Sequence, residues 1–269
     1  MPGELLYKFR NWNDPFCKKC LLEQEIYFAS PKQFNDPFDC SLNIWFDELT
    51  KQQKIDKYYK HIKERSPHKT DKEIIHEAEN MLKEGLLEKE AIIHTNEKII
   101  APMTYQQVGV LSFSKNRDHI LLWSHYADNH QGICIGYNKE ILLKLFESKY
   151  NTIKKVFVDV DVDYQEQYPT FIPDESISDE EFVKRQLRTK SSVWSYEEEY
   201  RILLLGGARE ITHVPKEAIA EVILGCKIPD RDKIEIGKYV ITELPQTALF
   251  QAKKSEKSFN LIFIKENFI

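Results

Sequence analysis

The chain has 269 residues, of which 42% are hydrophobic and 30% charged, a composition that is typical of a globular protein and excludes a disordered one. Its formal net charge is −5 at pH 7 and its pI is near 6.0. The chain therefore lacks the basic excess that draws proteins non-specifically to nucleic acids or to anionic lipid.

The sequence predicts a cytoplasmic protein with reduced cysteines. Its apolar runs fall short of the roughly 20 residues of a membrane-spanning helix, and Met1–Glu4 lacks the layout of a signal peptide. The 5 cysteines are odd in number and scattered, which favours free thiols over a disulfide framework. Cys17 and Cys20 form a C-x-x-C pair, but no second paired cluster would complete a zinc site. We therefore expect packing thiols and no metal.

The N-terminal part predicts a strand, a short helix and a second strand. Leu5–Arg10 alternates between apolar and polar residues, and Ile26–Ala29 is a second extended run. A loop at 30–39 follows, because prolines there prevent the continuation of a helix. Its Asn35 and Asp36 have side chains that suit the capping of backbone donors, so we expect this loop to be ordered.

The segment from about 47 to 106 predicts an α-helical insertion. It is rich in Glu and Lys and poor in turn formers. Thr50 with Gln53 and Thr70 with Glu73 match the capping-box pattern of helix starts. We expect the two helices to pack against one side of a sheet.

The remainder of the chain predicts strands with short helices between them. Val156–Val162 is the clearest strand, because valines point one way and acids the other, as in half-buried antiparallel sheet. The other predicted elements are strands at 108–114, 132–137, 201–205, 219–224 and 259–264, and helices at 120–129 and after 178. Together they predict a single α+β domain, 1–269, that includes the C-terminal strands at 219–265.

Two clusters have metal-ligating residues but also simpler explanations. His125 and His130 are five residues apart, unlike the i, i+4 pair of metalloproteases. Asp159, Asp161 and Asp163 share one strand face, a pattern that a solvent-exposed sheet edge explains equally well. A metal-dependent nuclease that uses Asp159, Asp161 and His125 remains one alternative function.

The acidic run Glu197–Glu199 opens directly onto a strand. Alternation predicts that Glu197, Glu199 and Arg201 share one face, with Glu199 held by the sheet. A carboxylate at a strand end suits catalysis, whereas pairing with Arg201 would make it structural. Polar residues lie among aromatic ones at three more places: Tyr7-Lys-Phe-Arg10, Ser112-Phe-Ser114 and Trp123-Ser-His-Tyr126. An arginine fork can hold a phosphate, and aromatic faces can stack on a heterocycle.

Glycine motifs for nucleotide binding are missing from the sequence. It contains neither G-x-x-x-x-G-K-[ST] nor G-x-G-x-x-G, so neither a P-loop nor a Rossmann cofactor site is supported. A nucleotide would have to be bound in another way.

Several motifs, in the order of the chain, resemble the bacterial domain-of-unknown-function family 2971 (DUF2971). They are Tyr7-Lys-Phe-Arg10, Ile26-Tyr-Phe-Ala-Ser-Pro31, Phe34-Asn-Asp-Pro-Phe-Asp39, Leu121-Leu-Trp-Ser-His-Tyr-Ala127 with Gly132, and Trp194-x-Tyr-Glu-x-Glu-Tyr-Arg201. The resemblance ends at about residue 205 and carries no settled activity. The order of Arg, Ser-x-Ser and Glu-x-Glu also looks like the pattern of the ADP-ribosyltransferase superfamily, which implies a split antiparallel or mixed β-sheet core.

This second resemblance implies an enzyme that cleaves the nicotinamide–ribose bond of NAD, with NAD as substrate and no metal. It assigns Arg10 to a phosphate or ribose of NAD, and Ser112 or Ser114 to the support of the pocket. Glu199 would contact the nicotinamide ribose and Glu197 would orient the target. A nearby carboxylate suits this chemistry, because the bond breaks through an oxocarbenium-like state, as in glycoside hydrolysis.

The same pocket would take aromatic and supporting residues. Trp123 or Tyr126 would stack on nicotinamide, although each is equally credible as a core residue. The other assigned residues are Tyr7 as a cofactor contact and Asn35, Asp36 and Arg201 as support. The ADP-ribose would pass to water or to a protein or nucleic-acid target. A toxin or phage-defence effector with an antitoxin or defence partner is the candidate role, and a non-catalytic nucleotide- or protein-binding module is the other alternative.

Overall fold

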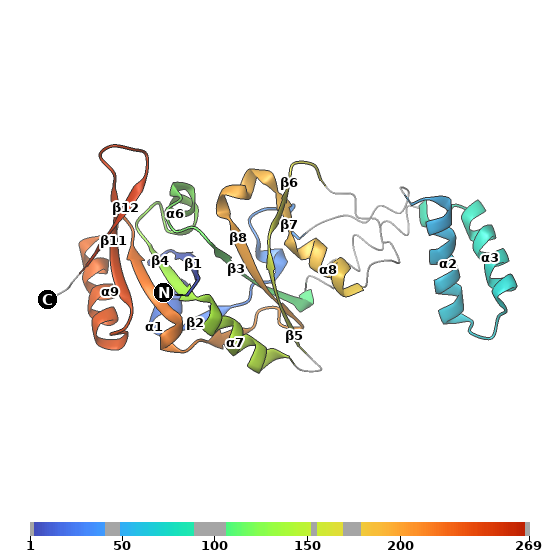
Figure 1. Ribbon diagram of the computed structural model, residues 1–269, viewed down its shortest axis with the longest axis horizontal. Coiled ribbons are helices and arrows are strands. Elements are labelled where there is room, and N and C mark those ends of the chain that lie inside the picture. Colours follow the sequence, from blue (N-terminus) through green and yellow to red (C-terminus); the bar gives the residue numbers. More distant parts are fainter. Residues whose placement is uncertain (1–2, 41–48, 89–105, 152–154, 169–178, 267–269) are drawn as a thin grey trace. The chain divides into compact units, whose positions relative to one another are not determined.

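The computed structural model describes residues 3–40, 49–88, 106–151, 155–168 and 179–266 (Figure 1). The chain divides into two compact units, which are described separately. Unit 1 consists of Met1–Gln33, Gln107–Val162 and Val193–Ile269, and unit 2 consists of Phe34–Gln106 and Asp163–Ser192. The acidic run at 197–199 therefore belongs to unit 1.

An eight-stranded sheet forms the centre of unit 1, in the order β12-β11-β10-β4-β1-β3-β8-β5 (Figure 1). Its strands are β1 (Leu5–Arg10), β3 (Val108–Ser114), β4 (Ile133–Asn138), β5 (Val156–Asp161), β8 (Glu199–Leu205), β10 (Ile219–Leu224), β11 (Ala248–Lys254) and β12 (Leu261–Lys265). Neighbouring strands are antiparallel except β10 and β11, which are parallel. The prediction of an α+β fold on a mixed, mostly antiparallel sheet is confirmed.

Short elements complete both units. Those of unit 1 include α1 (Pro15–Leu22), β2 (Glu25–Tyr27), η1 (Pro31–Gln33), α6 (Ile120–Tyr126), α7 (Lys139–Tyr150), β9 (Ile211–His213), η5 (Lys216–Ala218) and α9 (Asp230–Glu243). Those of unit 2 include α2 (Lys51–Arg65), α3 (Asp71–Lys83), η2 (Leu86–Glu88), β6 (Asp163–Gln165), α8 (Asp179–Arg188) and β7 (Thr189–Ser191). The turn η4 (Ser192–Glu197) leads from β7 into β8. The helices α7 and α9 were not predicted from the sequence.

The two faces of the large sheet carry two separate hydrophobic clusters. Side chains alternate between the faces along each strand, so Leu6 and Phe9 of β1 point in opposite directions. Leu6 belongs to a cluster that includes buried residues of α1, α7 and α9, and we call this the helical face. Phe9 belongs to a cluster with Trp123 of α6, and we call this the α6 face. Each candidate residue on a strand can therefore be assigned to one face.

The sheet splits between β1 and β3. All residues of β1 pair with β4, whereas β1 and β3 pair only at Tyr7, which lies opposite Ser114. Nearer the start of β3, Val110 forms an isolated bridge with Ala29 instead of pairing with β1. The edge of β3 around Ser112 is thus not paired with β1.

A loop with left-handed backbone ends α6 and packs against the end of β1. Three consecutive residues, Asp128 to His130, have φ angles of 48°, 52° and 71°. A right-handed helix cannot continue through such angles, so the prediction of a helix over 120–129 was too long at its C-terminal end. After the loop, Gly132 accepts a backbone hydrogen bond of 2.9 Å from Gly225.

Gly132 has no room for a side chain, which gives a first prediction. A Cβ atom there would overlap the carbonyl oxygen of Arg10 and crowd the backbone of Ala127. Gly132→Ala is expected to lower the free energy of unfolding by about 1–3 kcal/mol, because the backbones must move apart. Urea denaturation would measure the change, with Gly3→Ala as control, since the three atoms nearest to a Cβ there all belong to the side chain of Asn138. Equal stability of the Gly132→Ala variant and wild type would contradict this packing.

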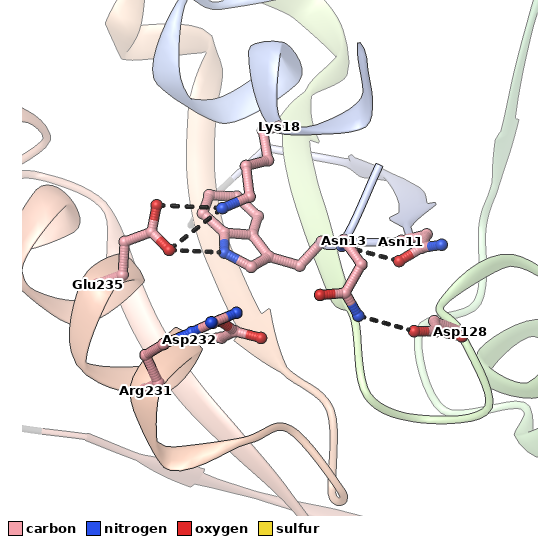
Figure 2. A network of polar contacts seen from close by, with 8 residues as sticks. Asn11, Asn13, Lys18, Asp128, Arg231, Asp232 and Glu235 are labelled. Atoms are coloured by element: carbon pink, nitrogen blue, oxygen red, sulfur yellow. Dashed lines mark hydrogen bonds and ion pairs between the residues drawn. The ribbon is translucent and has the colours of Figure 1, made fainter. Parts of the chain in front are cut away.

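Polar contacts hold α1 against α9 (Figure 2). The indole nitrogen of Trp12 and the ammonium of Lys18 each donate to Glu235 of α9 at 3.2 Å. Lys18 also lies 4.7 Å from the centroid of the Trp12 ring. In the same region, Asn13 donates to Asp128 at 3.0 Å. The segment after β1 is therefore fixed both to α9 and to the loop that follows α6.

In unit 2, both predicted capping boxes are confirmed. Thr50 caps α2 together with Gln53, and Thr70 caps α3 together with Glu73. The two helices share a small buried cluster whose members are Tyr58, Ile62, Ile74 and Ala78. None of the helices in the described ranges is both long and apolar enough to cross a membrane.

Candidate functional site

A row of five residues crosses the α6 face of the sheet. Register places Glu199 opposite Ser114, Ser114 opposite Tyr7, Tyr7 opposite Gly136, and Gly136 opposite Glu221. Directly paired residues share a face, so these side-chain positions lie side by side. With strands about 4.8 Å apart, the row spans about 19 Å from β8 to β10. The structure thus brings Glu199, Ser114 and Tyr7 together on one face.

Glu199 forms a buried ion pair with Arg201. The guanidinium donates from Nε to Oε1 at 2.8 Å and from Nη2 to Oε2 at 3.0 Å. The relative exposure of Arg201 is 0% and that of Glu199 is 6%. Ser112 lies opposite Arg201 in the register and therefore shares this face. The prediction that Glu199 and Arg201 share a face is confirmed, and the pair orients the carboxylate through two charge-assisted hydrogen bonds.

Ser114 has a local structural role within the row. Its hydroxyl donates to the carbonyl of Asn116 at 2.9 Å and accepts from the amide of Asn116 at 2.9 Å. The side-chain amide of Asn116 in turn donates to Glu198 at 3.1 Å. These bonds fix the end of β3 beside the start of β8.

Glu197 lies outside the strand, in the turn η4. Glu198 follows with a φ of 43°, so strand alternation does not extend back to Glu197. Glu197 is buried, with a relative exposure of only 5%. The hydroxyl of Tyr126 in α6 donates to it at 2.7 Å. Glu197, two residues before Glu199, is therefore held by a tyrosine of α6.

Aromatic rings gather around this turn. His119 and Tyr196 are stacked with their centroids 5.0 Å apart. His125 lies 6.2 Å from Tyr126 and 6.5 Å from Trp194, measured between ring centroids. Trp123 is instead a core residue, since it is fully buried and its indole nitrogen donates to the carbonyl of Arg117 at 2.8 Å. The rings around the turn are half-buried or exposed and offer flat faces for a heterocycle, whereas the buried ring of Trp123 does not.

The end of the row at Glu221 on β10 contains a network of polar contacts that was not predicted from the sequence. Arg117 donates to Glu221 at 2.8 Å, and Tyr7 hydrogen-bonds the same carboxylate. Burial and the negative charge of Glu221 raise the pKa of Tyr7 to about 12. A Cβ atom on Gly136 would collide with Glu221 and crowd Tyr7, so this glycine allows their approach. The only signal in the sequence was one acid in the otherwise apolar run Ile219–Leu224.

Arg10 lies on the helical face, and the structure does not bring it together with Glu199. It is three positions from Tyr7 on the same strand, so the two side chains point to opposite faces. Its Nε instead donates to the thiol of Cys20 in α1 at 3.3 Å. An NAD molecule on the α6 face would therefore not contact Arg10.

The predicted supporting residues Asn35 and Asp36 lie in unit 2. Asp36 accepts from the amide of Phe38 at 2.9 Å, which forms the kind of side-chain turn that the loop sequence predicted. Asn35 is exposed. Their assignment to a pocket with Glu199 stays a prediction.

The residues named for a metal-dependent nuclease are separated by the sheet. Asp161 lies opposite Tyr200, which places it and Asp159 on the helical face, whereas His125 belongs to α6. Asp159 accepts from the hydroxyl of Tyr200, and Asp161 pairs with Lys115. Asp163 begins β6, so the prediction of three acids on one strand was wrong. Within the described ranges, no group of three or more His, Cys, Asp or Glu side chains is arranged to hold a metal ion.

Lys8 occupies the split between β1 and β3 and has an unusual pKa. Its ammonium donates to the carbonyl of Ser112 at 2.5 Å. Burial, followed by the positive charge of Arg10, lowers the pKa of Lys8 to about 7, while Cys20, Glu199 and Cys17 act in the other direction. The folded protein thus releases this proton far more easily than the unfolded chain, whose lysines have a pKa of about 10.4.

This shift predicts how stability depends on pH. Between about pH 7 and pH 10 the unfolded state binds more protons at Lys8 than the folded state. The contribution of Lys8 to the free energy of unfolding therefore increases with pH over this range. Urea denaturation from pH 7 to 9.5 would show a steeper rise in wild type than in Lys8→Met. Identical pH slopes for the two proteins would show that Lys8 keeps an ordinary pKa.

Fold and site together define an α+β protein with a mostly antiparallel eight-stranded sheet that carries a polar row under a short helix. Residues 122–202 match the model of a family described as "Protein of unknown function (DUF2971)", which supports the resemblance seen in the motifs. The matched segment runs from α6 into β8 and so includes Tyr126, Glu197, Glu199 and Arg201. No curated protein and no solved structure matches the chain.

Proposed function

We propose that this chain is an ADP-ribosyltransferase-like enzyme that cleaves the nicotinamide–ribose bond of NAD, with Glu199 as the catalytic carboxylate. The observation that carries the proposal is the position of Glu199 at the end of a core strand, oriented by Arg201 and beside Ser114 and Tyr7. A carboxylate that is already held in place does not have to be reoriented when positive charge develops on a sugar. It therefore lowers the barrier to cleavage of the glycosidic bond.

The reaction needs only groups of this chain, NAD and an acceptor. The bond between the ribose C1′ and the nicotinamide nitrogen breaks, and its electron pair leaves with nicotinamide. Glu199 stabilises the oxocarbenium-like ribose, while an acceptor oxygen attacks C1′ and releases its proton. Glu197, hydrogen-bonded by Tyr126, is positioned to orient that acceptor. The acceptor is water or a macromolecule.

The remaining contacts differ from those that the sequence predicted. Arg10 takes no part, because it lies on the other face. Arg117, at the Glu221 end of the row, is the cation that we assign to the diphosphate. Tyr196 and His125 replace Trp123 as candidates for stacking on a base, because they are not fully buried. A role as a toxin or phage-defence effector, with an antitoxin or defence partner, rests on the resemblance alone.

One observation favours a second candidate, a non-catalytic nucleotide-binding module. Both oxygens of Glu199 already accept hydrogen bonds from Arg201, as in ion pairs that are purely structural. Purified protein incubated with NAD distinguishes the two candidates. Release of nicotinamide supports the enzyme. A rise in the melting temperature with NAD but without nicotinamide release supports the binding module.

A further inference from the structure

Two cations lie on the helical face of the sheet, close to each other on β1. Lys8 and Arg10 are two positions apart on β1 and therefore point to the same side. Within the described ranges, neither forms a hydrogen bond or an ion pair with a carboxylate. Lys8 donates to a backbone carbonyl, and Arg10 donates to a thiol at 3.3 Å and to its neighbouring carbonyl at 3.3 Å. Such charges in a protein interior are costly unless something compensates them.

A buried tyrosine next to these cations also lacks a partner. Tyr137 on β4 is 0% exposed, and its hydroxyl forms no hydrogen bond with any residue that the structure describes. Its ring packs edge-on against Phe113 at 5.7 Å, and the ammonium of Lys8 lies 5.4 Å from the centroid of the same Phe113 ring. Both Arg10 and Cys20 are close enough to influence the ionisation of Tyr137. These groups therefore form one cluster.

We propose that Lys8, Arg10 and Tyr137 form a binding site for a phosphate-type oxyanion on the helical face of the sheet. A phosphate group would supply the negative charge that the two cations lack. It would also accept a hydrogen bond from the hydroxyl of Tyr137, which is otherwise unsatisfied.

The split in the sheet positions Lys8 within this cluster. Because β1 and β3 pair only at Tyr7, the ammonium of Lys8 can reach the carbonyl of Ser112 in the gap between the strands. Lys8 and Arg10 both remain partly exposed to solvent, so an anion can reach them. Cys20 accepts from Nε of Arg10 and the carbonyl of Phe9 accepts from Nη1, so among the described residues Nη2 is the nitrogen left for a ligand.

The chemistry of the site fits inorganic phosphate and the phosphate of a nucleotide equally. It does not depend on the proposed NAD cleavage, because Glu199 lies on the α6 face. Phosphate binding is measured without NAD and without nicotinamide release, so failure of one proposal leaves the other intact.

Titration calorimetry of the full chain with inorganic phosphate, and separately with ADP, tests the site. Sodium chloride at matched ionic strength separates binding from general screening. We expect saturable phosphate binding that weakens at least about tenfold in Arg10→Met, the size of one charge-assisted hydrogen bond, and several-fold in Tyr137→Phe. Affinity for ADP well above that for phosphate identifies a nucleotide as the ligand, and equal affinities identify free phosphate.

Two further variants distinguish a loss of phosphate binding from a loss of folding. Lys8→Met removes an uncompensated cation, so it is expected to fold at least as well as wild type while also losing at least about tenfold in phosphate affinity. Lys19→Met is the control, because Lys19 lies on α1 and pairs with Glu23 near solvent. Three results would overturn the site: heat changes that match those of sodium chloride, unchanged affinity in folded Lys8→Met, or an equal loss of affinity in Lys19→Met.

Discussion

Glu199→Gln is expected to lower the rate of nicotinamide release from NAD at least about 100-fold, the scale on which single electrostatic contacts stabilise a transition state. Glutamine keeps the size of the side chain and one acceptor for Arg201, but it removes the negative charge that stabilises the sugar cation. The rate would be measured by chromatography of released nicotinamide, with circular dichroism to verify that the variant is folded.

The neighbouring acid provides a matched control. Glu198 is exposed and its carboxylate accepts a hydrogen bond from Asn116, so Glu198→Gln makes the same chemical change one residue away. Its activity should stay within about twofold of wild type, since surface substitutions are generally mild. Equal activity of folded Glu199→Gln and wild type would remove Glu199 from catalysis.

Arg201→Met is expected to lower the free energy of unfolding by about 3–5 kcal/mol, because it leaves the buried charge of Glu199 without the guanidinium that donates two hydrogen bonds to it. Arg201 is fully buried and forms both bonds to that carboxylate. Urea denaturation followed by circular dichroism would measure the loss.

A charge-balanced double variant separates stability from catalysis. Glu199→Gln combined with Arg201→Met removes both charges, so it should be more stable than Arg201→Met alone. It should nevertheless remain inactive, because the carboxylate is gone. A double variant that is no more stable than Arg201→Met would show that the ion pair does not account for the instability.

Individual strands and helix starts could be predicted because each is encoded by a few neighbouring residues in the sequence. The strand at Val156–Asp161 follows from strict alternation, and the capping boxes at Thr50 and Thr70 mark two helix starts. The shared face of Glu199 and Arg201 follows from the same period of two. Such patterns need no knowledge of which strands are neighbours.

The residues that make up the site were predicted less accurately than the local elements, because they depend on how the strands are aligned with one another. Tyr7 and Arg10 were assigned to one pocket although an odd spacing puts them on opposite faces of a strand. Either Tyr7 or Arg10 could share a face with Glu199. The strand register decides between them, because Tyr7 pairs with Ser114, which is itself opposite Glu199. Glu221 and Arg117 were missed because they come from distant segments that only the fold brings together.

A crystal structure of the protein with an NAD analogue whose nicotinamide–ribose bond resists cleavage would test the central claim most directly. We predict that the nicotinamide ribose lies against the carboxylate of Glu199, on the face of the sheet that α6 covers. An analogue bound only on the helical face, away from Glu199, would contradict the assignment of this carboxylate to NAD cleavage.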